Sequence, residues 1–262
     1  MKTIIVIPTY NEHDNIRELI PCIRKETQGL ALDMLVVDSA SPDRTADAVR
    51  EIQKEDRGVF LLEQPKKLGL GKAYLDGVDW VLQHSYDCMI MMDADFSHHP
   101  KYLREIVKGL ETHDLVIGSR YIPCGGLQDW PVHRIGLSRF ANWYARTLTG
   151  LPFSDLTAGF AGYRTDLLRR IVRYRIHAEG YAFTIEMKHL AILQGARALE
   201  IPIVFTDRTK GDSKISKRVI LESVFFCLKR FFQRKRIRAA LAKIQSNQSD
   251  GRENAVCEKT AR

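Results

Sequence analysis

The first 120 residues alternate short apolar runs with amphipathic stretches, and this alternation constrains the fold more than any other feature. The apolar runs predict buried strands at Thr3–Pro8, Met34–Asp38, Val59–Glu63, Cys88–Asp93 and Leu115–Gly118. The stretches between them predict helices at Asn15–Glu26, Thr45–Lys54, Gly71–His84 and Lys101–Thr112. Strands that alternate with helices form βαβ units, so we expect an α/β fold with a mostly parallel central sheet flanked by helices.

The pattern is less regular after residue 120. Ser138–Thr149, Thr165–Arg175 and Phe183–Gln194 predict helices, and Leu151–Gly162 predicts an irregular segment. Ala198–Phe205 predicts one more strand. We expect residues 1–213 to form a single catalytic or binding domain, since no internal repeat divides them.

The C-terminal part is different in charge. Residues 214–262 hold 13 Lys and Arg and four Asp and Glu, a net charge of 13 − 4 = +9, so the first 213 residues sum to −1. Residues 214–245 predict a basic amphipathic helix, clearest over Ser216–Leu241. Its apolar face comprises Ile220, Leu221, Val224, Phe225, Leu228, Phe231 and Phe232. The polar residues 246–262 predict a disordered tail.

Such a helix is typical of one that lies in an anionic membrane interface. Packing of the same face on the domain core or on a partner helix is the alternative. Binding of nucleic acid is not expected, because no recognition motif accompanies the basic charge.

The remaining composition indicates a cytoplasmic protein. The five cysteines are widely spaced without a CxxC pair, which favours a reducing compartment over a disulfide framework. The first apolar run stops at Pro8, too early for a signal peptide, and no run is long enough to span a bilayer. A membrane-bound role therefore requires peripheral attachment on the cytosolic face, and a membrane-anchored partner subunit is left open.

Acidic and polar residues follow the predicted strands where a ligand is expected. In open α/β sheets ligands bind beyond the carboxyl ends of the strands. Thr9–Glu12, Asp38–Ser41 and Asp93–Asp95 occupy these positions. Asp93 and Asp95 could share a hard divalent cation that bridges nucleotide phosphates, although a pair of solvated acids at a strand end is the alternative for such a short motif.

Several basic residues are candidates for binding phosphate. Gly69-Leu70-Gly71-Lys72 fails both Gly-rich nucleotide motifs, yet Lys72 could still offer charge to a phosphate. Basic residues outside the predicted strands could together bind a second anionic group, although each alone would suit a solvated surface: Arg120, Arg134, Arg139, Arg208 and Lys214.

Nine segments together resemble the dolichol-phosphate mannosyltransferases, within the family 2 glycosyltransferases. They occur in the family's order between residues 3 and 216. The segments are IIVIPTYNE (4–12), SPDRT (41–45), KLGLGKAY (67–74), MDADFSHHP (92–100), GSRY (118–121), SRFAN (138–142), DLTAGFAGYR (155–164), GYAFTIEM (180–187) and FTDRTKGDSK (205–214).

The resemblance implies a GT-A nucleotide-sugar fold and an inverting transfer of mannose from GDP-mannose to a polyprenyl phosphate. It implies that Asp93 and Asp95 hold Mg²⁺ or Mn²⁺, with Ser97 at a third ligand position, and that Asp95 is essential for catalysis. Positions that would receive the acceptor phosphate are Arg120, Arg134 and Ser138. Positions that would line the nucleotide-sugar site are Pro8, Tyr10, Glu12, Val37, Ser39, Lys72, Asp93, Ala94, Arg208 and Lys214.

Two departures from the family pattern bear on the donor. Ser39 stands where the family usually has a second acid, and Ala40 replaces a common Gly. A donor such as UDP-glucose or UDP-GlcNAc therefore stays open. A non-catalytic membrane-docking protein that keeps the fold is the alternative of another class.

Overall fold

The structure, a computed structural model, describes residues 1–176, 178, 180–206 and 217–244. The predicted strands join into one seven-stranded sheet in the order β3-β2-β1-β4-β7-β5-β8. Their bounds are β1 Thr3–Thr9, β2 Leu32–Asp38, β3 Val59–Glu63, β4 Cys88–Met91, β5 Leu115–Ser119, β7 Ala161–Arg164 and β8 Ala198–Pro202. All neighbouring strands are parallel except β7, which runs antiparallel to both β4 and β5. The expected α/β fold with a mostly parallel sheet is confirmed.

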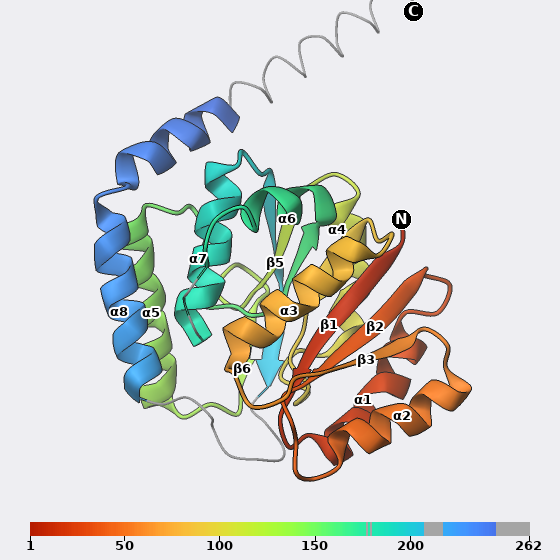
Figure 1. Cartoon of the computed structure of the whole chain (residues 1–262). Helices are drawn as coiled ribbons and strands as arrows, with labels where there is room; N and C mark the ends of the chain where they lie inside the picture. The colour runs from red at the N-terminus through yellow and green to blue at the C-terminus, as the bar shows by residue number, and fades with distance from the viewer. Residues whose placement is uncertain (177, 179, 207–216, 245–262) are drawn as a thin grey trace, which may run out of the picture.

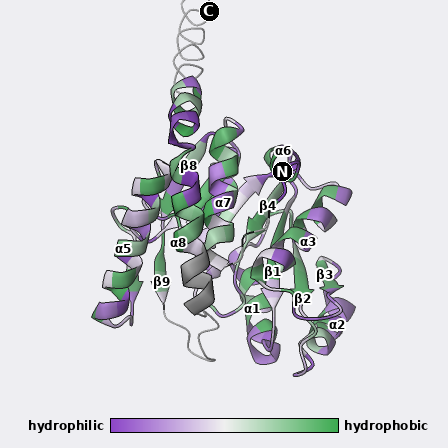
Figure 2. Ribbon diagram, turned by 60° about the vertical axis from the view of Figure 1, so that its left-hand side comes forward, coloured by the Kyte–Doolittle hydropathy of each residue, from purple (hydrophilic) through white to green (hydrophobic). Residues whose placement is uncertain are grey.

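Helices cover both faces of this sheet (Figure 1). Alternate residues of each strand point to opposite faces, so the sheet has two hydrophobic cores. One core is covered by α1 (His13–Glu26), α2 (Thr45–Glu55) and α4 (Leu103–Leu110), which follows the short helix η1 (Pro100–Tyr102). The other is covered by α3 (Leu70–Gln83), α6 (Thr165–Ile171) and α7 (Gly180–Leu193). The strands are hydrophobic along most of their length, whereas the helices carry polar stripes (Figure 2).

Several details of the second half differ from the sequence prediction, the strands most of all. The segment expected to be irregular ends in strand β7, which pairs in the middle of the sheet. The single strand expected over Ala198–Phe205 divides at Ile203, because β5 ends at Ser119 and leaves β8 without a partner beyond Pro202. The chain then continues as β9 (Val204–Thr206), which pairs with β6 (Gly126–Gln128) in a separate two-stranded sheet.

The C-terminal helix α8 (Lys217–Phe231) lies beside α5 (Val132–Thr149) and α7 (Figure 1). The single helix expected over Ser216–Leu241 is interrupted at residues 232–233, after which residues 234–244 are again helical. Tyr144 of α5 donates a hydrogen bond to the carbonyl oxygen of Val224 (3.3 Å), and Arg230 of α8 pairs with Glu186 of α7. These contacts attach α8 to the domain.

The orientation of α8 leaves much of the predicted apolar face exposed. Cys227 is buried, and Phe226 packs against the core. Phe225, Leu228 and Phe231 are exposed, as is Phe232 just beyond the helix. Within the described residues, no helix has the length and hydropathy needed to cross a bilayer. The predicted tail 246–262 lies outside the described residues.

Candidate active site

Three loops meet at the carboxyl edge of the sheet, and each contains a residue in the left-handed backbone region. Asn11 follows β1 (φ 57°), Ala40 follows β2 (φ 55°) and Phe96 follows β4 (φ 61°). A side chain makes this conformation unfavourable by about 1–2 kcal/mol, and such strain concentrates at binding and catalytic sites. Ala40, which stands where the resemblance leads us to expect Gly, therefore keeps the turn despite its Cβ.

The loops after β1 and β2 are joined through Asp38. The Asp38 carboxylate accepts hydrogen bonds from the Thr9 hydroxyl (2.9 Å) and from the Ser41 hydroxyl (2.6 Å) and backbone N–H (2.9 Å). Ser39 donates to the Gln64 side-chain oxygen (2.8 Å), and Gln64 donates in turn to Asp76 (2.6 Å). Ser39 therefore connects to a carboxylate through Gln64, although it has none of its own.

Asp93 and Asp95 stand just beyond β4. Asp95 is buried, and its carboxylate accepts hydrogen bonds from the backbone N–H (3.1 Å) and the hydroxyl of Ser97. The Asp93 side chain is 31% exposed at the loop edge. The described residues contain no group of three or more His, Cys, Asp or Glu that could hold a metal. Two carboxylates nevertheless fit a Mg²⁺ or Mn²⁺ ion whose other ligands are phosphate oxygens and water.

Two aromatic side chains fix the position of Asp93. Tyr74 of α3 donates its hydroxyl to the carboxylate (3.2 Å), and burial together with the Asp93 charge raises the pKa of Tyr74 well above its ordinary value. His98 is buried against Phe160 and accepts the backbone N–H of Asp93 (3.0 Å). Because burial lowers the pKa of His98, the ring stays neutral and keeps this acceptor.

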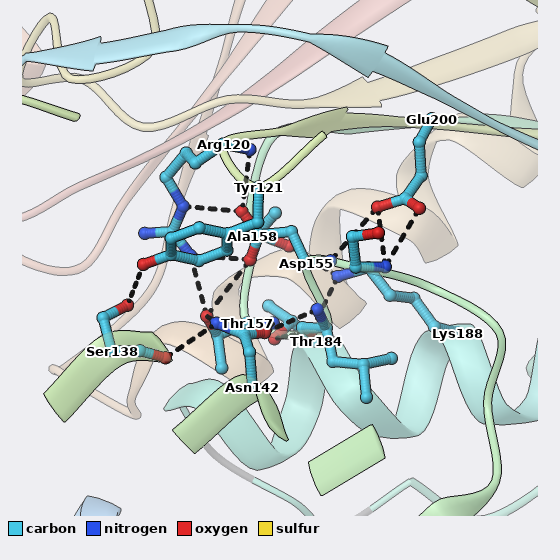
Figure 3. A network of polar contacts seen from close by, with 12 residues as sticks. Arg120, Tyr121, Ser138, Asn142, Asp155, Thr157, Ala158, Thr184, Lys188 and Glu200 are labelled. Atoms are coloured by element: carbon cyan, nitrogen blue, oxygen red, sulfur yellow. Dashed lines mark hydrogen bonds and ion pairs between the residues drawn. The ribbon is translucent and has the colours of Figure 1, made fainter. Parts of the chain in front are cut away.

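A second group of polar residues centres on the buried Arg120 (Figure 3). Its guanidinium binds Asp155 through two hydrogen bonds (2.6 and 2.7 Å) and Thr157 through a third (2.7 Å). The adjacent Tyr121 donates its hydroxyl to Ser138 of α5 (2.7 Å). Arg120 and Ser138, two of the residues predicted to receive an acceptor phosphate, are therefore connected through Tyr121. Tyr121 follows Arg120 in the chain and binds Ser138 through its hydroxyl.

The segment from Ser154 to Ala158 is held by side chains from three other elements. Asn142 of α5 accepts the backbone N–H groups of Leu156 and Thr157 (2.7 and 3.2 Å). Glu200 of β8 accepts those of Ser154 and Asp155 (2.9 to 3.1 Å). Lys188 of α7 donates to the carbonyl oxygens of Leu156 and Ala158 (2.9 and 2.6 Å). All of these bonds lie within one network (Figure 3).

The same segment connects the two groups of polar residues. Asp155 pairs with Arg120, and beyond Ala158 the chain continues past Gly159 to Phe160, on which His98 stacks. A Cβ at Gly159 would lie 3.9 Å from Asp93 Oδ2 and 3.4 Å from His98. The acidic edge and the Arg120 group are therefore connected by one short segment.

The other residues predicted for this site are distributed less uniformly. The Lys67 ammonium lies 3.7 Å from the centre of the Tyr10 ring, and the Arg134 guanidinium lies 3.9 Å from that of the Trp130 ring. The Glu12 carboxylate accepts a hydrogen bond from the Asn15 side chain. Pro8 pairs with Val37 in the sheet, and Lys72 forms an ion pair with Asp76.

Two of the predicted positions have buried side chains. The side chains of Val37 and Ala94 are buried in the hydrophobic cores, so these two positions can line a ligand only through the backbone. Arg208 and Lys214 lie outside the described residues.

Comparison with known proteins identifies the family. Residues 4–172 match the family Glycosyl transferase family 2. The chain belongs to this family. The glycosyltransferase is 39% identical over 224 residues to undecaprenyl-phosphate mannosyltransferase of Micrococcus luteus, covering 86% of this chain and 91% of that protein. It is 38% identical over 226 residues to polyprenol monophosphomannose synthase of Mycolicibacterium smegmatis, covering 86% and 84%.

Solved structures show the same GT-A fold. Glucosyl-3-phosphoglycerate synthase of Mycobacterium tuberculosis, solved with Mn²⁺, UDP and its product, aligns with a TM-score of 0.60 at 19% identity, over 86% of this chain and 80% of that one. A mannosyltransferase of Pyrobaculum calidifontis, solved with GDP-mannose and Mn²⁺, aligns with a TM-score of 0.57 at 19% identity, over 97% and 80%. The glycosyltransferase thus has the nucleotide-sugar fold that its sequence predicts.

Sequence reasoning assigned no role to several residues that shape this site. Tyr74, His98 and Asp155 lie inside segments that carried the resemblance, so only their roles were missing. Lys188 and Glu200 lie outside those segments. A lysine within the long apolar stretch of α7 was the available signal for Lys188, because a buried charge requires a partner.

We expect Lys188 to make the stability of the glycosyltransferase depend on pH. Burial lowers the pKa of Lys188 to about 7, with Asp155 opposing the shift. Above pH 7 the unfolded chain therefore binds a proton that the folded chain does not. The free energy of unfolding should rise there by up to about 1.4 kcal/mol per pH unit and lose this contribution as pH falls to 7.

Urea unfolding of wild type and Lys188→Met between pH 6 and 9 measures this contribution. The difference between the two proteins should change with pH above 7, because methionine does not titrate. Lys54→Met, at an exposed position of α2, is the control and should keep the wild-type slope. Parallel curves for wild type and Lys188→Met would contradict the prediction.

Proposed function

We propose that this glycosyltransferase transfers mannose from GDP-mannose to a polyprenyl phosphate, while bound peripherally to the cytosolic face of a membrane. Two relatives named for mannose transfer to polyprenyl lipids match most of the chain at 38–39% identity. The observation that supports the proposal most is the segment Asp155–Phe160, which contacts Arg120 at one end and passes Asp93 at Gly159. A site with carboxylates at one end and guanidinium groups at the other suits a metal-bound diphosphate and an anionic acceptor.

The residues suit a phosphate acceptor better than a hydroxyl acceptor. A lipid phosphate is ionised at neutral pH and needs no general base, whereas a hydroxyl would need a positioned one. Arg120 and Ser138 would hold the phosphate in line with the sugar carbon, with Arg134 nearby on α5. Asp93 and Asp95 would hold Mg²⁺ or Mn²⁺, which offsets charge on the departing nucleoside diphosphate.

A donor screen tests this proposal. Purified protein is incubated with Mn²⁺, short-chain polyprenyl phosphate and a panel of labelled nucleotide-sugars, and label in the organic phase is counted. We expect label from GDP-mannose. Label from UDP-glucose or UDP-GlcNAc instead would keep the reaction and change the donor, and the Ser39–Gln64–Asp76 chain is the feature that would explain the change. Folded protein that transfers no sugar would exclude the proposed reaction.

The membrane part of the proposal rests on exposed apolar side chains on two adjacent helices. On α5 these are Val132, Leu137, Phe140 and Trp143, which are 58–85% exposed. On and just beyond α8 they are Phe225, Leu228, Phe231 and Phe232, which are 43–86% exposed. Lys229 of α8 is also exposed, and Arg230 lies partly exposed beside it. Basic residues beside exposed aromatic side chains suit an anionic bilayer surface.

We expect Phe225→Glu combined with Phe232→Glu to reduce binding to anionic vesicles by at least about tenfold. Burial of each Phe side chain in the bilayer would otherwise contribute up to about 1.5–3 kcal/mol of binding free energy. Both side chains point away from the core, so the variant should stay folded. Co-sedimentation of purified protein with vesicles measures the binding. Tyr174→Glu, at an exposed aromatic position on the α6–α7 connection, is the control.

Equal sedimentation of the double variant and wild type would contradict docking through this face. Failure of wild type itself to bind would instead favour attachment through a membrane-anchored partner subunit.

A further inference from the structure

A cavity of about 400 Å³ opens between α5 and the segments that follow β5. Arg120, Tyr121 and Ser154 line one side of it. The other side is a single face of α5 that carries Arg139, Asn142, Trp143 and Arg146. Positions three, four and seven residues apart share one face of a helix, so the two arginines flank the Asn and Trp about 10 Å apart along the axis.

The positive charge of this cavity is only partly offset. Arg120 is paired with Asp155 in two hydrogen bonds. By contrast, Arg139 and Arg146 are exposed, and neither guanidinium makes a hydrogen bond or ion pair with any residue that the structure describes. The lining residues that the structure describes include no carboxylate. The nearby acids Asp155 and Glu200 accept backbone N–H groups of Arg120 and Asp155 instead. Within the described part of the chain, two guanidinium groups therefore line the cavity without an acidic partner.

The polar groups between the two arginines are already hydrogen-bonded within the protein, so the arginines are the main donors to a ligand. Both ends of the Asn142 side chain are committed, to Ser138 and Thr157 on one side and to Leu156 on the other. The Tyr121 hydroxyl donates to Ser138. An anion in this part of the cavity would thus be bound mainly by Arg139 and Arg146, whose planar groups suit the oxygens of a phosphate.

The mouth of the cavity adjoins the exposed apolar face of α5. Trp143 lines the cavity and is 61% exposed, and its ring lies 5.7 Å from that of the exposed Phe140. A ligand with a phosphate at one end and hydrocarbon at the other would satisfy both surfaces at once. Tryptophan is common at this kind of boundary because its ring is apolar and its N–H is polar.

We propose that Arg139, Arg146 and Trp143 form a second phosphate-binding subsite, which holds the phosphate monoester of a membrane lipid beside the Arg120–Ser138 position. The subsite rests on the proposed function, since it would bring a lipid phosphate to the edge of the acceptor position. The lipid is either the polyprenyl phosphate before it reacts or a phospholipid headgroup.

Vesicle binding tests the subsite without any need for turnover. Arg139→Gln combined with Arg146→Gln is compared with Arg173→Gln combined with Arg175→Gln, which removes the same charge from exposed positions on the α6–α7 connection. The vesicles are made of a neutral lipid to which either polyprenyl phosphate or phosphatidic acid is added. Both additions are phosphate monoesters. We expect the first double variant to bind about tenfold more weakly than the control, as loss of a charged hydrogen bond predicts.

The two vesicle types separate the sources of the phosphate. Weaker binding to polyprenyl phosphate vesicles alone assigns the subsite to the acceptor, and weaker binding to both assigns it to lipid phosphates in general. Equal binding of both double variants to both vesicle types would overturn the subsite.

Turnover in detergent gives a second, independent readout. If the acceptor uses the subsite, Arg139→Gln with Arg146→Gln should raise KM for polyprenyl phosphate about tenfold and leave kcat close to wild type, because only binding before the reaction is lost. A fall in kcat at constant KM would contradict a separate subsite and place the arginines at the reacting phosphate. Absence of turnover in wild type would refute the proposed function, while the vesicle comparison would still decide the subsite.

Discussion

Asp95→Asn should lower kcat by at least about a thousandfold, because it should weaken binding of the metal. A metal stabilises the charge of the transition state by several kcal/mol, which corresponds to three or more factors of ten in rate. The carboxylate of Asp95 is buried at the end of β4, and Asn keeps an oxygen for the Ser97 N–H and hydroxyl. The substitution therefore removes charge while it preserves most of the local hydrogen bonding. The rate of mannose transfer, measured at saturating donor and acceptor, checks the expectation.

Metal binding should change together with the rate. Titration of Mn²⁺ in the presence of GDP, followed by electron paramagnetic resonance, should show weaker binding to Asp95→Asn than to wild type. Asp79→Asn, at an exposed position of α3, controls for the loss of one negative charge and should behave as wild type. Wild-type rates from folded Asp95→Asn protein would remove Asp95 from the metal site.

Asp155→Asn should lower the free energy of unfolding by about 3–5 kcal/mol, because it leaves the buried Arg120 guanidinium without its counter-charge. Asp155 is fully buried and Arg120 is 7% exposed. Burial alone would raise the pKa of Asp155, but Arg120 outweighs it and holds that pKa below its ordinary value. The pair should therefore stabilise the fold at neutral pH and lose this contribution as pH falls through the pKa of the folded state.

Thermal unfolding in the absence of ligands measures this loss. A domain of this size should melt roughly 10 °C lower in Asp155→Asn, since each kcal/mol corresponds to about 2–4 °C. Arg120→Met combined with Asp155→Leu should recover part of the stability while it abolishes transfer, because no unpaired charge remains buried. If Asp155→Asn melts within a degree of wild type, Arg120 has another partner of equal strength.

The first half of the fold could be predicted from local pattern, whereas β7 could not. Buried parallel strands such as β1 and β2 are nearly continuous apolar runs, and such runs are visible without tertiary information. Strand β7 contains Ala161 and Gly162, which have little preference for strands. A Cβ at Gly162 would lie 2.7 Å from Ile106 of α4, so the glycine is required by helix packing rather than by the strand. Only the assembled fold reveals that requirement.

The candidate site divides in the same way. The acids after β1, β2 and β4 could be placed at one edge from topology alone, because parallel strands bring their carboxyl ends together. The partner of Arg120 could not be found by spacing, since Asp155 is 35 residues away and joins it only through the antiparallel return of the chain. Val37 and Ala94 are positions for which the sequence predicts more contact with a ligand than their side chains can make. Their positions match the family, but burial directs their side chains into the cores.

The helix α7 has a consequence for how the enzyme would stand on a bilayer. Glu186 holds Arg230 of α8, and two residues later Lys188 holds the carbonyl oxygens of the active-site segment. About half a turn of a buried helix thus separates the contact with α8, the helix proposed to face lipid, from the contact with the segment proposed to form the site. The depth at which α8 enters the interface would then set the height of the reacting phosphate above the bilayer plane.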